Sequence, residues 1–174
     1  MKKSLLSIAL LAITASSVNA ASNENVNVRF TGLVKAATCQ VTVGQNGNLV
    51  DLGRLDVKPN AEGTLIPVMF NFKNCTAATT TVKDITFVGG QAGGQHQTQQ
   101  GILGTDKKNV EVRLHNDTDT ANGTFQAKVD INKQVNNGAD TLTVTPFYAQ
   151  LKAGGQAPET GTVTTVGLFT VNYQ

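Results

Sequence analysis

The sequence has few of the residues on which enzymes and cofactor-binding proteins depend. Histidine and cysteine occur twice each, tryptophan is absent, and charged residues make up 15% of the chain. His96 lies in a stretch rich in glycine and glutamine, and His115 ends an alternating stretch. Neither has a carboxylate and a nucleophile in a recognisable catalytic context. The segment GGQAGG lacks the lysine and hydroxyl residue of a phosphate-binding loop. We therefore expect no enzyme activity and no cofactor.

No apolar run is long enough for a transmembrane helix. Residues 1–20 begin with Lys2 and Lys3, continue with an apolar stretch over residues 5–13 and end in small residues up to Ala20. This order predicts a secretory signal peptide that is removed on export. The apolar stretch is too short to span a bilayer, which disfavours a membrane anchor. We expect one soluble, exported domain, formed by the 154 residues that remain of 174 and long enough to bury a core.

A surplus of charge of either sign is also missing. The expected signal peptide carries two of the 14 lysines and arginines and none of the 12 aspartates and glutamates, so the rest of the chain carries 12 of each. A neutral chain has no basic face for nucleic acid and no polybasic patch for a membrane surface. Its low self-repulsion favours association with other proteins.

Cys39 and Cys75 are the only cysteines. In an exported chain, two cysteines predict one disulfide, which here closes a loop of about 36 residues and stabilises the fold by about 3–4 kcal/mol. A metal site or a reactive thiol pair is the weaker alternative, because there is no Cys-x-x-Cys spacing and no histidine nearby. Asp117 and Asp119 have the alternate spacing of a calcium loop but lack its later glutamate, so we expect a turn there.

After the signal peptide, the residue patterns predict β structure. Alternating or β-branched stretches predict strands, Asn-Gly pairs predict tight turns, and a change of alternation at Pro146 predicts a bulge or a sheet edge. No segment of helical length combines an apolar stripe with a cap, and residues 89–101 are expected to be an exposed loop. Together these signals predict an all-β sandwich or barrel. The strands are expected over residues 35–43, 65–75, 109–116, 124–132 and 141–153, and the turns at residues 46–47, 122–123 and 137–138.

Two more alternating stretches lie at the ends of the mature chain. In residues 25–34 every second residue is apolar or glycine: Val26, Val28, Phe30, Gly32 and Val34. In residues 161–174 the corresponding set is Val163, Thr165, Gly167, Phe169, Val171 and Tyr173. The chain stops one residue after Tyr173, so we expect an unpaired apolar edge beside this last strand, which is an aggregation hazard. From periodicity alone, residues 25–34 are the first strand of a complete sandwich.

The chain resembles the fimbrial subunits, or pilins, of the bacterial chaperone–usher pathway. The resemblance covers essentially the whole mature chain. It rests on VNVRFTGLV with Gly32 upstream of Cys39, on FNFKNC leading into Cys75, and on FYAQLKA as the penultimate strand. The closing strand adds Gly161, fourteen residues from the end, and the penultimate Tyr173. Each feature alone is weak, but the set is specific.

The resemblance implies an incomplete immunoglobulin-like β-sandwich that lacks its last strand and is completed by a donor strand from a neighbouring subunit. Residues 21–34 are then the N-terminal donor-strand extension, and residues 35–174 are the pilin domain. The donor face consists of Val26, Val28, Phe30, Gly32 and Val34. The acceptor groove beside the C-terminal strand consists of Gly161, Val163, Phe169, Val171, Tyr173 and Gln174. Thr165 and Gly167 depart from the apolar residues that the family often carries at these positions.

The resemblance further implies a structural protein that is exported through the periplasm and polymerises head to tail into a surface fibre mediating adhesion. The implied partners are a periplasmic chaperone that grips the terminal carboxylate, an outer-membrane usher, other copies of the chain, related pilins and a host receptor reached through the fibre. Two alternatives stay open. One is an adaptor or adhesive subunit at the fibre tip, with residues 89–101 as a candidate receptor-binding loop. The other is an independent secreted β-sandwich that binds a ligand as a monomer.

Overall fold

Ten β-strands and no α-helix make up the part of the chain that the computed structural model describes. This part comprises residues 26–33, 39–44, 47–76, 79–90, 100–119, 124–136 and 141–174, with backbone only for residues 26–33 and residue 79. The expected signal peptide lies outside it. Within the described ranges, no helix is long and apolar enough to cross a membrane. The strands are β1 (Val26–Leu33), β2 (Gln40–Val43), β3 (Leu49–Gly53), β4 (Ile66–Lys73), β5 (Thr79–Gly90), β6 (Ile102–Gly104), β7 (Val110–His115), β8 (Lys128–Asn136), β9 (Leu142–Ala153) and β10 (Val166–Tyr173).

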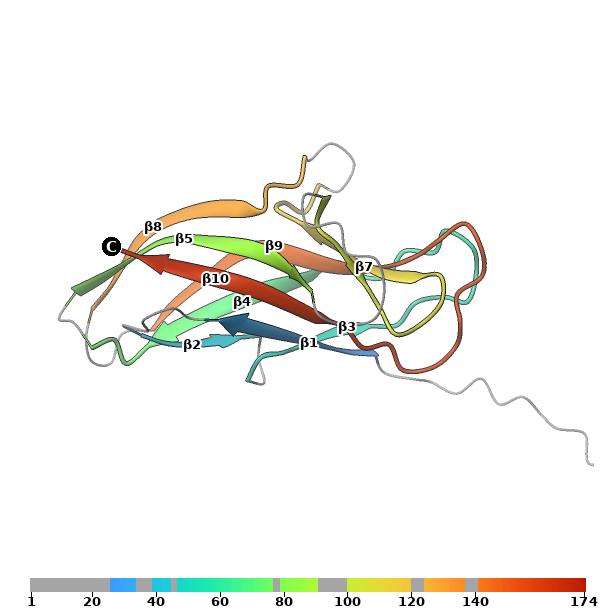
Figure 1. Ribbon diagram of the computed structural model, residues 1–174, viewed down its shortest axis with the longest axis horizontal. Helices are drawn as coiled ribbons and strands as arrows, with labels where there is room; N and C mark the ends of the chain where they lie inside the picture. Colours follow the sequence, from blue (N-terminus) through green and yellow to red (C-terminus); the bar gives the residue numbers. More distant parts are fainter. Residues whose placement is uncertain are drawn as a thin grey trace, which may run out of the picture.

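The strands form two five-stranded sheets that pack face to face (Figure 1). Sheet A has the strand order β3-β1-β10-β5-β8, and sheet B has the order β2-β4-β9-β7-β6. Neighbouring strands are antiparallel in every described pair except β1 with β10, which run parallel. Two packed, mainly antiparallel sheets form an immunoglobulin-like sandwich, as the expected fold class requires.

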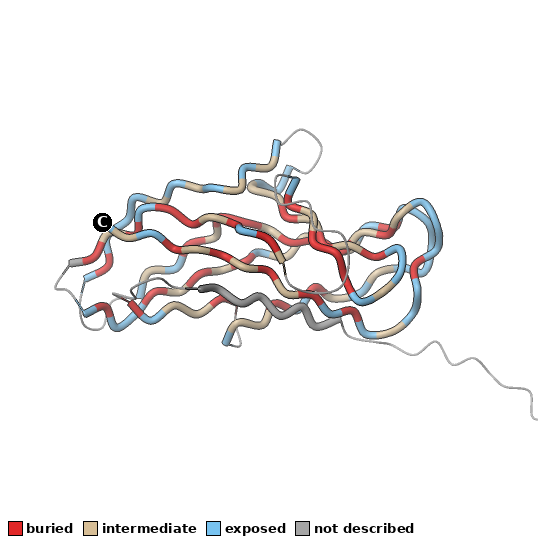
Figure 2. The backbone as a smooth tube through the Cα atoms, viewed as in Figure 1, coloured by how far each residue is buried: buried red, intermediate tan, exposed pale blue. Residues whose placement is uncertain are grey.

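The core lies between the sheets because alternate residues of most strands point inward. Figure 2 shows this alternation of buried with partly or fully exposed positions, for example along β7 and β10. Aromatic side chains fill the middle of the core. The phenylalanines that are at most 1% exposed are Phe70, Phe72, Phe87, Phe147 and Phe169.

The strand that completes sheet A comes from the N-terminal segment of the same chain. β1 lies between β10 and β3 in the strand order of sheet A, and Figure 1 shows β1 alongside β10. The resemblance implied that a neighbouring subunit fills this position, whereas in the single chain it is filled from within. A tethered segment has a high effective concentration at its own sheet, which favours this closure when no other strand competes for the position.

Several expected strands agree closely with the observed ones. β4, β7 and β9 lie within the expected ranges 65–75, 109–116 and 141–153. The irregularity at Pro146 is a bulge, because the pairing of β4 with β9 shifts register between Val68 and Phe70. β9 is the central strand of sheet B, so the alternative of a sheet edge at this proline is wrong.

Three strands were not expected from the sequence: β3, β5 and β6. β5 is 12 residues long and extends to Gly90, so Gly89 and Gly90 belong to a strand and not to the expected loop 89–101. Residues 91–99 lie outside the described part. β8 also begins later than expected, at Lys128, and continues to Asn136. The alternation of β5 is interrupted at Lys83, where its pairing with both neighbouring strands shifts register.

Cys39 and Cys75 form the predicted disulfide, so the metal-site and free-thiol alternatives for this pair are wrong. Cys39 directly precedes β2 and Cys75 follows β4, and these two strands are neighbours in sheet B. The expected turn after β7 is also present, since the Asp119 backbone N–H donates a hydrogen bond to Oδ1 of Asp117 at 3.3 Å. Among the described residues, no group of three or more histidine, cysteine or carboxylate side chains is placed to hold a metal ion.

Candidate strand-insertion site

The candidate site is the position between β10 and β3 that β1 occupies. The first half of β1 pairs antiparallel with β3, where Val28 lies opposite Val50. The second half pairs parallel with β10, where Gly32 lies opposite Phe169. In sheet A, β3 has no strand neighbour other than β1 among the described strands. An inserted strand therefore satisfies main-chain groups on both sides that water or another chain would otherwise have to satisfy.

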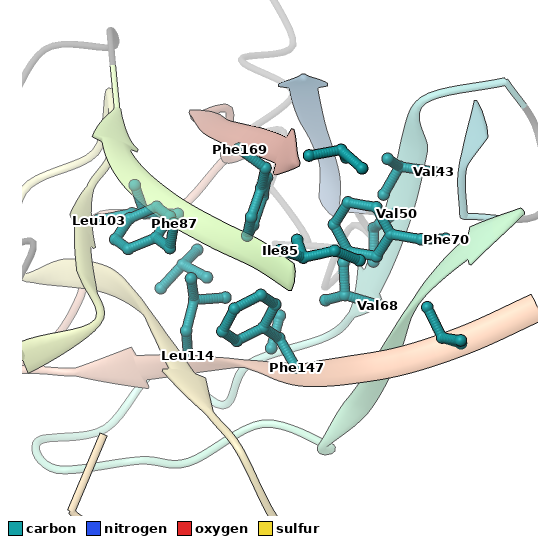
Figure 3. Packing of buried hydrophobic residues seen from close by; sticks show 14 of the residues in the cluster. Val43, Val50, Val68, Phe70, Ile85, Phe87, Leu103, Leu114, Phe147 and Phe169 are labelled. Carbon is teal, nitrogen blue, oxygen red and sulfur yellow. The ribbon is translucent and has the colours of Figure 1, made fainter. Parts of the chain in front are cut away.

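Phe169 forms the centre of the surface that β10 presents to the core. Its side chain is 0% exposed. Its ring centroid lies 5.3 Å from that of Phe70, 5.4 Å from that of Phe87 and 5.4 Å from that of Phe147. Figure 3 shows the ring directed from β10 into this cluster, which unites β5 of sheet A with β4 and β9 of sheet B. Packing on three sides holds Phe169 in place and leaves it little freedom to make room for a neighbour.

Two residues expected in the acceptor groove precede the strand. β10 begins at Val166, whereas Gly161 and Val163 lie in the segment before it. This segment is held by sheet B and the loop that follows β6. The Thr165 hydroxyl donates a hydrogen bond to the Gly104 carbonyl at 2.6 Å, and the Thr164 N–H donates to Asp106 Oδ1 at 2.6 Å. Val163 is buried, but the part of β10 that pairs with β1 starts three residues later, at Val166.

The C-terminal end of β10 is tied to β5. The Gln174 N–H donates to the Thr81 carbonyl at 2.9 Å, and the Thr81 N–H donates to a terminal carboxylate oxygen of Gln174 at 3.3 Å. The Tyr173 ring packs edge-on against Phe72, with the ring centroids 6.4 Å apart. Its hydroxyl is buried and has no hydrogen-bond partner among the described residues. Burial raises the pKa of Tyr173 to about 12.

The raised pKa of Tyr173 predicts a loss of stability at alkaline pH. Up to the ordinary tyrosine pKa of about 10, the hydroxyl is protonated in both the folded and the unfolded chain. Above it the unfolded chain loses this proton and the folded chain keeps it up to pH about 12, so the free energy of unfolding falls as the pH rises through this window. Denaturant unfolding across the window should show a shallower decline in Tyr173→Phe. Tyr148→Phe is the control, because Tyr148 is the other of the two tyrosines in the chain. If the free energy of unfolding falls with pH as steeply in Tyr173→Phe as in Tyr148→Phe, the assignment to Tyr173 is wrong.

A buried carboxylate lies on the outer face of sheet A and links β10 to its other neighbours. Asp84 of β5 is 2% exposed. The side-chain amide of Asn172, on β10, donates a hydrogen bond to Asp84 Oδ1 at 2.6 Å, and Lys128 Nζ, on β8, lies 3.3 Å from Oδ2. The Thr86 hydroxyl also donates to Oδ1 at 3.3 Å. The hydrogen bond from Lys128 to Asp84 raises the pKa of the Lys128 ammonium group. Asp84 thus connects three strands of the sheet.

Replacing Asp84 with alanine should lower the free energy of unfolding by about 1–3 kcal/mol, the range for losing hydrogen bonds to a buried charged group. Asn172 and Thr86 lose their acceptor in this variant. Lys128→Ala is the matched control and should have a much smaller effect, because the Lys128 side chain is 54% exposed and water replaces its ion pair. Equal losses in the two variants, measured by denaturant unfolding, would contradict the central role of Asp84.

Sequence reasoning located part of the site. Phe169 and Val171 are buried in β10, where the alternation placed them. Val34 lies outside the described residues, and the donor role of the N-terminal residues stays a prediction. The contribution of β3 and the buried Asp84 were missed. The β-branched stretch TTTVKDITFV was a signal for β5, but the bulge at Lys83 hides the face on which Asp84 lies.

Comparison with known proteins assigns the chain to a family. Residues 12–174 match the sequence profile of the family described as "Fimbrial protein". The chain belongs to this family. It is 26% identical to the Major MR/P fimbria protein of Proteus mirabilis (strain HI4320) over 181 residues, which cover 100% of each chain. The crystal structure of the P pilus rod subunit PapA matches with a TM-score of 0.47 and 14% identity, over 79% of this chain and 100% of that chain.

Family membership defines the general role of the chain. It is a fimbrial subunit, a pilin with one intrachain disulfide, and it is exported to form fimbriae on the cell surface.

Proposed function

We propose that the chain is a structural subunit that polymerises by donor-strand exchange. Residues 21–34 of one subunit take the position between β3 and β10 in the next subunit. The observation that supports this most is that a terminal strand occupies this position in the single chain. Along the chain, β1 is connected to the other described strands only at its C-terminal end. It can therefore leave the sheet without removing another strand from it. Contacts of this head-to-tail kind do not close, and an open fibre follows from them.

The apolar residues of the donor segment supply the driving force for the exchange. Burying Val26, Val28, Phe30 and Val34 contributes about 1.5–3 kcal/mol each, or on the order of 6–12 kcal/mol together before the cost of ordering the segment. Backbone hydrogen bonds to the strands on both sides add affinity, as is usual when a strand joins a sheet. Such a join is strong enough for a fibre that mediates adhesion.

The proposal assigns partners to the stages before assembly. A periplasmic chaperone fills the position beside β10 and holds the terminal carboxylate of Gln174 until the subunit reaches an outer-membrane usher. There the donor segment of another copy, or of a related pilin, replaces the chaperone. Gln174 follows β10, the strand that borders this position, and its main-chain groups pair with Thr81 of β5 on the other side of that strand.

Expression with the cognate chaperone and usher tests the proposal. The mature chain should form fibres in electron micrographs and a ladder on an SDS gel without boiling. Deletion of residues 21–34 should leave a subunit that binds the chaperone but donates nothing, so that fibres and ladder disappear. Immunogold labelling along the whole fibre, and not only at its tip, separates a structural subunit from a tip adaptor.

Two results would contradict the proposal. One is a full-length chain that stays monomeric beside a functional chaperone and usher. The other is normal fibre formation by the deletion variant. The first result would favour the secreted monomeric binding module.

A further inference from the structure

A cavity of about 290 Å³ opens on the side of the sandwich, between β3 of sheet A and β4 of sheet B. Neither strand has a described strand partner on this side. β3 is the edge strand of sheet A, and β2 pairs with β4 only from Phe70 onward. The side chains around the cavity include Leu49, Val50, Asp51, Ile66, Pro67 and Met69.

The cavity is apolar inside and acidic at its rim. Val50 is 3% exposed and Ile66 packs against the core, so these two residues connect the cavity to the hydrophobic interior. Asp51 is the only charged residue of the lining, and it is exposed. Apolar pockets with one charged group bind apolar groups and orient them through that charge. The cavity therefore fits an apolar side chain that has a cation next to it.

An apolar side chain of this kind lies on the loop between β3 and β4, at the end of the sandwich opposite the C-terminus (Figure 1). Val57 is 59% exposed, and it and Val88 are the two exposed large apolar residues among the described side chains. The Lys58 N–H donates a hydrogen bond to the Asp56 carbonyl at 2.9 Å. A bond across a single residue defines a γ-turn, so Val57 lies at the apex of a tight turn.

The loop holds Val57 in place. The Asn60 N–H donates to the Gly154 carbonyl at 2.8 Å, and the Ala153 N–H donates to the Ala61 carbonyl at 2.8 Å. A tip that is already ordered loses little conformational entropy when it binds. Lys58, the next residue after Val57, pairs with Asp56 at 2.9 Å, but both side chains are well exposed, so water and a second carboxylate can compete for this ammonium group.

We propose that Val57 of one copy of the chain enters the cavity between β3 and β4 of a second copy, with Lys58 beside Asp51. Val57 does not line the cavity of its own chain. The two surfaces differ, so the contact is heterologous and continues from copy to copy. It goes beyond the proposed function, because it joins copies by a surface that the donor segment does not form.

Cross-linking between two single-cysteine variants tests the contact. The Val57→Cys chain is mixed with the Met69→Cys chain under mild oxidation, and peptide mapping identifies the new disulfide. Cysteine keeps the small apolar character that the cavity requires. Val88→Cys mixed with Met69→Cys is the matched control, because Val88 is the other exposed valine, at 46%. The 57–69 product should form roughly tenfold faster than the 88–69 product, since burial of one small apolar side chain is worth at least this factor.

Charge exchange tests the orientation. Lys58→Glu in the Val57→Cys chain, or Asp51→Lys in the Met69→Cys chain, should slow the 57–69 reaction by roughly 2–5-fold, the scale of an exposed ion pair. Mixing the two charge-reversed chains should restore the rate, because the attraction returns with its signs exchanged. This recovery also shows that both reversed chains fold.

The outcomes separate this inference from the proposed function. Equal rates for the 57–69 and 88–69 products, or a faster reaction between two Met69→Cys chains, would overturn the contact whether or not fibres form. Failure of the exchanged charges to restore the rate would overturn the pairing of Lys58 with Asp51. Absence of fibres from the unsubstituted chain would contradict the proposed function and leave the cross-linking result intact.

Discussion

Replacing Gly32 with leucine is expected to abolish fibre formation while the chaperone-bound subunit stays folded. Gly32 lies opposite Phe169, whose ring is 0% exposed and packed on three sides. A leucine side chain at this position collides with the ring or lifts the strand away from β10, because a packed core does not yield to added volume without strain. In the proposed complex with the chaperone, residue 32 lies outside the site, so the substitution should have no effect on the fold of that complex.

Electron microscopy and a ladder on an unboiled gel measure assembly, and co-purification with the chaperone measures folding. Thr31→Leu is the matched control, since it adds the same side chain at the next residue, where the alternation places it on the other face of the sheet. Thr31→Leu should assemble normally. Fibres of normal length from Gly32→Leu would show that this glycine does not enter the site.

Truncation of Phe169 to alanine is expected to produce the largest loss of stability among single core substitutions at the site. Removing a buried phenylalanine costs about 3–5 kcal/mol, and Phe169 loses contacts with rings from both sheets. Denaturant unfolding of the monomer measures this loss. Phe125→Ala is the control, because Phe125 is only half-buried and its nearest ring centroids lie 6.0 and 6.1 Å away.

The two substitutions should also interact. In the Phe169→Ala background, Gly32→Leu gains the space that the ring occupied, so its effect should be smaller than in the original chain. Residues in contact give such non-additive effects, whereas independent sites give additive ones. Strictly additive effects of Gly32→Leu and Phe169→Ala would contradict the pairing of these two residues.

The fold was largely predictable where the alternation of a strand is uninterrupted. β7 alternates Val110, Val112 and Leu114 toward the core, and its expected range 109–116 differs from the observed one by one residue at each end. β5 could not be predicted in this way, because the bulge at Lys83 interrupts its alternation. Val82 and Asp84 lie on opposite faces of the strand, although both are buried. A local pattern cannot show such a change of face, since it results from pairing with strands distant in the sequence.

The residues of β10 that border the candidate site were predictable, but the second neighbouring strand and the origin of the inserted strand were not. Alternation indicated the buried face of β10, including Phe169 and Val171. It gave no information about the second neighbour of the inserted strand, because β3 is short and its pairing with β1 is set by the three-dimensional arrangement. It also gave no information about whose N-terminal segment fills the position, since one sequence supplies the same segment to every copy.

The placement of β3 has a practical consequence for the cell. Because β3 pairs only with β1 among the described strands of sheet A, a subunit without β1 in place exposes two unpaired strand edges, one on β3 and one on β10. Subunits in this state would aggregate by pairing through both edges. These two edges are protected only while a strand lies between them, as β1 of the same chain does here.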